Sequence, residues 1–213
     1  MFLAAVRPLA LLPYPGFLAL WIVLLAAVLL WLVRPLHPRW AVPVALCCVP
    51  ELVIVNIYLL LAAAVVLGVR RPEAWVFPAL TKVTTGVGLL WFAARADWTG
   101  LARGVGALGL LVGVSYLFEP GAWHAWVGFL LENRDGTPDS RLSFALRCVL
   151  AVVLVVVGAR RNWPWLLAPA VLLTSPVIAT LVPATVLVAV PRLIQPGALP
   201  AVHPVPAGSR TES

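Results

Sequence analysis

The feature that most constrains this chain is an unbroken apolar stretch at residues 16–33, GFLALWIVLLAAVLLWLV. A helix needs about 20 consecutive apolar residues to cross the hydrocarbon core of a bilayer. The stretch ends at the basic loop 34-RPLHPR-39, and Trp31 and Trp40 flank that loop, as aromatic residues do at a membrane interface. We therefore predict a membrane-spanning helix over these residues.

The composition of the whole chain agrees with a membrane protein. Its 213 residues are 62% hydrophobic and 11% charged, whereas a soluble domain carries about 25% charged residues. The net charge of +7 comes mostly from arginines that stand singly or in pairs between apolar runs, where positive charge orients membrane helices. The sequence has no basic helix face with interleaved aromatics, so we expect membrane lipid and no nucleic acid as a partner.

Further apolar runs predict an all-α, polytopic transmembrane helix bundle of about 6–8 membrane helices. Single spans are expected at residues 74–94, 100–118 and 142–159. The polar stretch 119–141 contains the aromatic segment AWHAWVGFLL, which we interpret as an amphipathic helix on the membrane surface.

Two longer apolar runs contain prolines, and the sequence leaves their form open. Residues 41–69 form one bent span, or a re-entrant helix followed by a span from about Leu52. Residues 164–193 form one kinked span or two short helices. We assign residues 1–194 to one integral membrane domain and expect the tail at 195–213 to be disordered.

The arginines also predict a topology. If the loops 34–39, 95–103 and 160–161 share the cytoplasmic side, they collect six arginines, as the positive-inside rule requires. The acidic loop 119–141 then lies outside. This topology needs an odd number of crossings between Trp40 and Arg70, and it leaves Arg70 and Arg71 outside.

Lys82 is the only lysine of the chain and lies inside the apolar run 78-PALTKVTTGVGLLWF-92. In a continuous helix it would lie about 13 Å from Glu73 and about 20 Å from Arg95. A lysine side chain reaches only about one helical turn toward the interface, and a charge buried in a membrane is costly. We therefore expect Lys82 to face a polar cavity or an acidic partner. The alternative is a lysine at the mouth of a shallow or tilted helix.

Other polar residues in apolar runs are candidates for the same site. Thr81, Thr84 and Thr85 lie within one turn of Lys82 and could line its cavity. Glu51 is either the counter-charge of Lys82 or a helix-start residue that the helix dipole favours. Asn56 makes either an interhelical hydrogen bond or a substrate contact. We expect Arg147, about a turn and a half into its predicted helix, to snorkel to the interface.

Motifs of soluble enzymes do not occur. The sequence has no paired carboxylates at catalytic spacing, no GxSxG or HExxH motif and no phosphate-binding P-loop. Its three cysteines form no CxxC or Cys/His pattern. We expect neither a metal nor a cofactor. The residues alone predict a polytopic membrane protein with a polar site around Lys82.

Three segments resemble a known family. They are the opening RPLALLPYPGFLALW, the run NIYLL at residues 56–60, and LGVRRPEAWVFPALTKVTTGVGLLWFAARADWTGLA at residues 67–102. Together they resemble the membrane enzymes of glycosyltransferase family 87. The matching residues are Asn56, Gly68, Arg70 or Arg71, Pro72, Trp75, Phe77, Thr81, Lys82, Thr84, Gly86, Gly88, Trp91, Phe92, Arg95 and Trp98. Two positions depart from the family pattern: Val55 replaces a usual glycine, and Thr85 replaces a usual proline.

The resemblance implies a fold and a reaction. Family members have the GT-C fold, and some are polyprenyl-phosphate-mannose-dependent mannosyltransferases of actinobacteria. We therefore expect a multi-pass protein of the bacterial plasma membrane that transfers a hexose from a polyprenyl-phosphate sugar donor to a lipid or cell-envelope glycan acceptor. By this resemblance Lys82 binds the phosphate of the donor, and Asn56, Thr81 and Thr84 are the further substrate-binding candidates.

The resemblance also implies a missing part. GT-C enzymes carry their catalytic aspartate in the first extracytoplasmic loop, and no aspartate precedes Asp97 here. We expect an N-terminally truncated chain, the C-terminal part of a family member, and assign no catalytic residue. The alternative is a non-enzymatic membrane protein, either a transporter half or an assembly partner. The absence of a repeated half in the sequence counts against a transporter.

Overall fold

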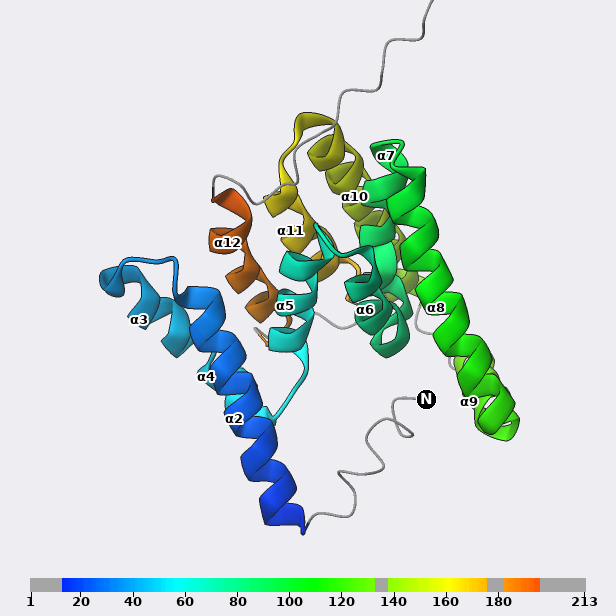
Figure 1. Ribbon diagram of the computed structural model, residues 1–213, viewed down its shortest axis with the longest axis horizontal. Coiled ribbons are helices and arrows are strands. Elements are labelled where there is room, and N and C mark those ends of the chain that lie inside the picture. The colour runs from blue at the N-terminus through cyan, green and yellow to red at the C-terminus, as the bar shows by residue number, and fades with distance from the viewer. Residues whose placement is uncertain (1–12, 133–137, 176–181, 196–213) are drawn as a thin grey trace, which may run out of the picture.

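The structure confirms the all-α class. Figure 1 shows the computed structural model, which describes residues 13–132, 138–175 and 182–195. Every regular element in these ranges is an α-helix or a 3₁₀-helix. Three of these helices are long and apolar enough to cross a membrane: α2 (Tyr14–Val33), α8 (Trp98–Phe118) and the Ser143–Arg161 part of α10 (Pro138–Arg161). They match three of the predicted spans.

The other described helices are shorter than a full span. They are α3 (Pro38–Cys47), α4 (Val49–Ile54), α5 (Tyr58–Gly68), η2 (Pro72–Trp75), α6 (Val76–Thr81), η3 (Val83–Leu89), α7 (Leu90–Ala94), α9 (Pro120–Glu132), η4 (Pro164–Leu166), α11 (Leu167–Leu173), η5 (Val182–Ala189) and α12 (Val190–Ile194).

The two proline-containing runs are both divided into short helices. In the first run α3 and α4 precede α5, which begins at Tyr58 rather than near Leu52. In the second run α11 and the η5–α12 segment are separate elements. The aromatic segment after α8 is helical, as α9, and its place on a membrane surface stays a prediction. The expected disordered tail lies almost wholly outside the described residues.

Helix α5 forms the centre of the bundle. Its sequence YLLLAAAVVLG is apolar on all sides after the first residue, and seven of its eleven residues are buried. A helix that is apolar all round belongs inside a bundle rather than on its surface. In Figure 1 α5 lies between α2 and α12 on one side and α6 and α10 on the other.

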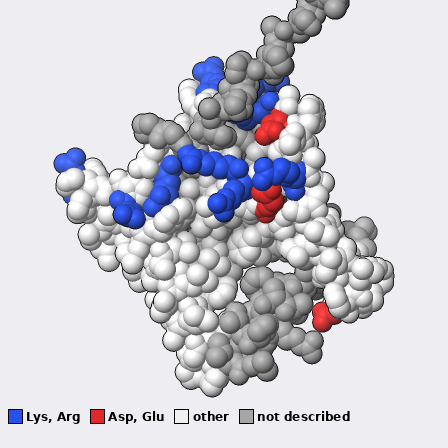
Figure 2. Space-filling view, viewed as in Figure 1, with Lys and Arg blue, Asp and Glu red and all other residues white. Residues whose placement is uncertain are grey.

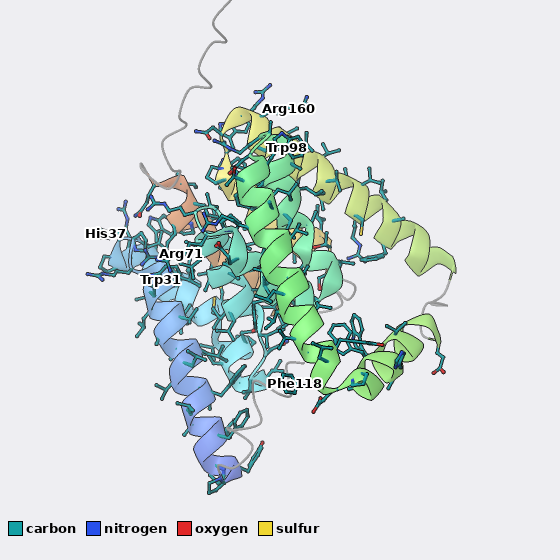
Figure 3. The ribbon with its side chains drawn as sticks, turned by 45° about the vertical axis from the view of Figure 1, so that its right-hand side comes forward. Trp31, His37, Arg71, Trp98, Phe118 and Arg160 are labelled. Atoms are coloured by element: carbon teal, nitrogen blue, oxygen red, sulfur yellow. The ribbon has the colours of Figure 1, made fainter. Side chains whose placement is uncertain are left out.

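The basic residues gather at one end of the molecule. Figure 2 shows Lys and Arg in a band across the upper part of the view, above a large uncharged surface. Hydrogen bonds join the elements at this end: Arg103 to Glu73, Arg95 to Asn162, and Arg192 to the carbonyl of Trp31. We call this band the arginine belt; the residues placed there by their contacts or in Figure 3 are Arg34, Arg71, Arg95, Arg103, Arg160 and Arg192.

The predicted topology is wrong for Arg70 and Arg71. Arg71 acts electrostatically on Glu73, whose carboxylate lies 2.6 Å from the Arg103 guanidinium. In Figure 3, Arg71 lies beside Trp31 and close to the level of His37. The reason is that α3 and α4 do not cross the bundle. The chain turns back after α4, and α5 returns it to the belt.

The predicted span at residues 74–94 is also wrong, because this segment is a re-entrant hairpin. It leaves the belt at Glu73 and returns to it at Arg95, since both residues bond to belt elements. Glycines in the returning arm lie against the descending arm. A Cβ on Gly86 would lie 3.1 Å from the Cβ of Ala79, and one on Gly88 would lie 2.1 Å from the Trp75 ring. Lys82 is at the tip of this hairpin.

The break at Lys82 has a local cause. α6 ends here, and the Lys82 N–H donates the last helical hydrogen bond to the Pro78 carbonyl at 2.9 Å. Lys82 then adopts an extended conformation with φ −146° and ψ 94°. Thr85 closes the turn: its N–H donates to the Lys82 carbonyl at 2.7 Å, and its hydroxyl lies 3.0 Å from the Pro78 carbonyl. Threonine hydroxyls compete with helical hydrogen bonds in this way.

Candidate functional site

Lys82 contacts two other segments of the chain through Tyr58. Its ammonium donates to the Tyr58 hydroxyl and lies 3.7 Å from the centre of the Tyr58 ring. The Tyr58 hydroxyl lies 2.8 Å from the hydroxyl of Ser175, which is fully buried. These contacts join the hairpin tip, the first residue of α5 and the end of α11. The ammonium is thus bound by both a ring face and a hydroxyl oxygen.

The site lies away from the arginine belt. The hairpin, α5 and α11 each have one end at the belt, and their other ends meet at Lys82, Tyr58 and Ser175.

Glu51 caps α5 and forms no ion pair with Lys82. It is fully buried, and its Oε1 accepts hydrogen bonds from the N–H groups of Tyr58 at 2.5 Å and Leu59 at 3.4 Å. These are donors that a helix N-terminus leaves without partners, and the helix dipole favours a carboxylate there. Among the described residues the one recorded salt bridge is Arg103–Glu73. Glu51 thus lies at two helix starts, in the first turn of α4 and at the N-terminus of α5, and it acts on Lys82 only through space.

One oxygen of Glu51 has no hydrogen-bond partner in the described structure. Oε2 is buried without a donor, although Lys82 is near enough to act on the carboxylate electrostatically. A buried carboxylate oxygen without a donor is rare in proteins.

The three threonines of the hairpin hold its backbone. The Thr81 hydroxyl donates to the Phe77 carbonyl at 2.8 Å. The Thr84 hydroxyl donates to the Thr174 carbonyl at 2.6 Å and so fixes the tip against the end of α11. Each hydroxyl keeps lone pairs that can accept a hydrogen bond. The structure places Thr81 and Thr84 beside Lys82, as predicted, and their role as substrate contacts stays a prediction.

Asn56 lies beside the site in the short break between α4 and α5. Its side-chain oxygen accepts a hydrogen bond from the Ile57 N–H at 2.9 Å. The main-chain N–H of Asn56 donates to the Glu51 carbonyl at 3.3 Å. It stands two residues before Tyr58. Its predicted substrate contact stays a prediction. The break begins at Val55, which has a left-handed conformation with φ 59° and ψ 40°.

Replacing Val55 with glycine should stabilise the protein. A β-branched residue is strained at positive φ, and the left-handed conformation costs about 1–2 kcal/mol. We expect Val55→Gly to gain about 1 kcal/mol in the free energy of unfolding after the entropy cost of glycine. Thermal unfolding of the purified protein in detergent would measure this. Val53→Gly, in α4 and exposed, is the matched control and should destabilise. A loss of stability in both variants would contradict the assigned strain.

Tyr58 and Ser175 belong to the site although the sequence did not predict them. Tyr58 is the one hydroxyl in the apolar run of α5, and Thr174 and Ser175 form a polar pair at the end of α11. Both were visible as polar residues in apolar surroundings. Their contacts with each other and with Lys82 could not be read from the sequence, since Tyr58 and Ser175 alone are 117 residues apart.

The described residues hold no cluster of three His, Cys, Asp or Glu side chains that could bind a metal ion. The site offers a cation, hydroxyl groups and one buried carboxylate. An ammonium held on a tyrosine can bind a phosphate as a point charge.

Comparisons with known proteins identify a family. The model of glycosyltransferase family 87 matches residues 1–203, which include every residue of the site described above. No curated protein and no solved structure matched the chain.

Proposed function

Because the chain belongs to glycosyltransferase family 87, and is thus a membrane glycosyltransferase, we propose that it transfers a hexose from a polyprenyl-phosphate donor in the bacterial plasma membrane. The acceptor is a hydroxyl of a lipid or cell-envelope glycan. Lys82 binds the phosphate of the donor at the tip of the hairpin. Asn56, Thr81 and Thr84 lie around the tip as further substrate-binding residues.

The position of Lys82 carries this proposal. The charge stands at the tip of a re-entrant hairpin whose two ends, Glu73 and Arg95, lie at the arginine belt. Irregular backbone is tolerated at membrane depth where it is buried in protein or lines a polar space. An ionisable residue at such a place favours a functional role over a structural one. The donor phosphate of a membrane lipid is an anion that can reach it.

Donor specificity tests the proposal directly. Membranes that contain the protein are given a radiolabelled polyprenyl-phosphate hexose or the same hexose as a nucleotide diphosphate sugar. We expect label to enter the lipid or glycan fraction from the polyprenyl-phosphate donor alone. Membranes without the protein provide the background. Transfer from the nucleotide sugar, with none from the lipid donor, would contradict the proposal.

A further inference from the structure

A second cation reaches the site from α10. Arg147 is the tenth residue of that helix, about 20 Å along the axis from Arg160 at the belt. Its Nη1 donates to the Ser175 carbonyl at 2.9 Å, and its guanidinium lies 5.3 Å from the centre of the Phe144 ring. The side chain is bound to the protein at the end of α11, so the predicted snorkelling is not what the structure shows.

Ser175 links the two cations. Its carbonyl accepts from Arg147, and its hydroxyl bonds to the Tyr58 hydroxyl, which accepts from Lys82. The ammonium and the guanidinium are thus separated by three hydrogen bonds and one serine. They come from a hairpin tip and a spanning helix that are 65 residues apart in the sequence.

The two charges have no carboxylate partner among the described residues. Each cation is bound to a neutral oxygen and stacked on an aromatic ring, and the only recorded salt bridge in the described ranges is at the belt. The nearby carboxylate, Glu51, acts on Lys82 only through space, and its Oε1 is bound to the N-terminus of α5. Cations in apolar surroundings are costly unless an anion joins them.

The proposed reaction creates such an anion. When the hexose leaves the donor, the bond between its anomeric carbon and the phosphate oxygen breaks, and the electron pair stays on the phosphate. A new bond forms from the anomeric carbon to the acceptor hydroxyl oxygen, whose proton passes to solvent. The donor is a phosphodiester with one negative charge. The released polyprenyl phosphate is a monoester with a second ionisation near pH 6, so it carries nearly two charges at neutral pH.

We propose that Arg147 is the second phosphate-binding residue and that it binds the charge that develops on the leaving phosphate. Lys82 meets the single charge of the donor, and Arg147 becomes fully engaged only as the second charge appears. An interaction stronger in the transition state than in the ground state raises kcat rather than lowering KM. This assignment rests on the proposed function.

Binding of model phosphates to the purified protein in detergent tests the assignment. The probes are a short-chain prenyl monophosphate, its methyl phosphodiester and the prenyl alcohol. At pH 7.5 we expect the wild-type protein to bind the monophosphate most tightly and the alcohol most weakly. Arg147→Gln should weaken monophosphate binding about ten- to a hundredfold and change diester binding much less. In transfer assays the same variant should lower kcat with little change in KM.

Arg192 provides the matched control. It too is a partly buried arginine that donates to a main-chain carbonyl and stacks on an aromatic ring, here Trp31, but it lies in the belt. Arg192→Gln should keep the preference for monophosphate.

If Arg147→Gln does not fold, Arg147→Lys and the pH profile of the wild-type protein carry the test. The preference of the wild-type protein should rise between about pH 5 and pH 7 as the monophosphate loses its second proton.

The outcomes separate the two proposals. If the wild-type protein binds neither anion more tightly than the alcohol, the proposed function fails. If it prefers the anions, but Arg147→Gln keeps the full preference for monophosphate, Arg147 only holds α11 and the further inference fails alone. A pH-independent preference in the wild-type protein would also overturn it.

Discussion

Replacing Lys82 with alanine is expected to abolish detectable transfer while the protein still inserts into the membrane. If Lys82 binds the donor phosphate, its loss removes a preorganised cation from a site shielded from water, where one such group is worth about 10²- to 10³-fold in rate. The side chain is only partly buried, and it packs on the Tyr58 ring rather than in the core, so the helices should remain folded. Initial rates of transfer, with the amount of protein in the membrane fraction, measure both effects.

Two variants control for the loss of local contacts. Tyr58→Phe removes the hydroxyl that accepts from Lys82 and keeps the ring on which the ammonium lies, so transfer should fall only about tenfold, as for one hydrogen bond to a charged group. Lys82→Arg keeps the charge with a different shape, and partial activity is expected. Transfer at the wild-type rate by Lys82→Ala would remove Lys82 from the site.

The long helices were predictable because a spanning helix leaves a strong trace in composition. The apolar runs that became α2, α8 and α10 are each close to the length that a bilayer requires. The hairpin at residues 72–94 was not predictable in the same way. Its two arms together are as long and as apolar as one span, so length and composition cannot distinguish a re-entrant hairpin from a single spanning helix.

Local signals for the hairpin were nevertheless present. Pro78 and the glycines at 86 and 88 stand on the two sides of Lys82, and each permits a break or a close approach. Thr85 was a further signal, since it replaces the proline that the family pattern has at this position. The structure gives the reason: the Thr85 N–H donates to the Lys82 carbonyl, which a proline could not do. Val55 stands where the family pattern has glycine, and its φ is positive. We find no contact in the described structure that offsets this strain.

The polar site was predicted in part. The depth of Lys82 in an apolar run was enough to expect a polar partner, but not to identify it. Glu51 was a reasonable candidate by charge, and the structure assigns it to the N-terminus of α5 instead. The actual partners, Tyr58 and Ser175, depend on how α5, α11 and the hairpin pack together. That packing is set by long-range contacts that no local pattern in a single sequence records.

Gly88→Ala is expected to destabilise the protein by about 3 kcal/mol or more, because overpacking here meets a rigid ring. A Cβ at position 88 would lie 2.1 Å, 2.2 Å and 2.3 Å from three carbons of the Trp75 ring. Trp75 cannot move away easily. It is fully buried, and its indole N–H donates to the Gly68 carbonyl at 3.2 Å. The added methyl must therefore separate the two arms of the hairpin.

Thermal unfolding in detergent and transfer assays would both register this change, because the arms of the hairpin position Lys82 at their tip. Gly113→Ala is the matched control: a Cβ there meets nothing within 4 Å, and alanine in an exposed helix should gain up to about 1 kcal/mol. A smaller side chain at position 75 provides the decisive comparison. If the ring causes the loss, Gly88→Ala should cost much less in a Trp75→Leu background than in the wild-type protein, and equal costs in both backgrounds would mean that the arms are not packed as described.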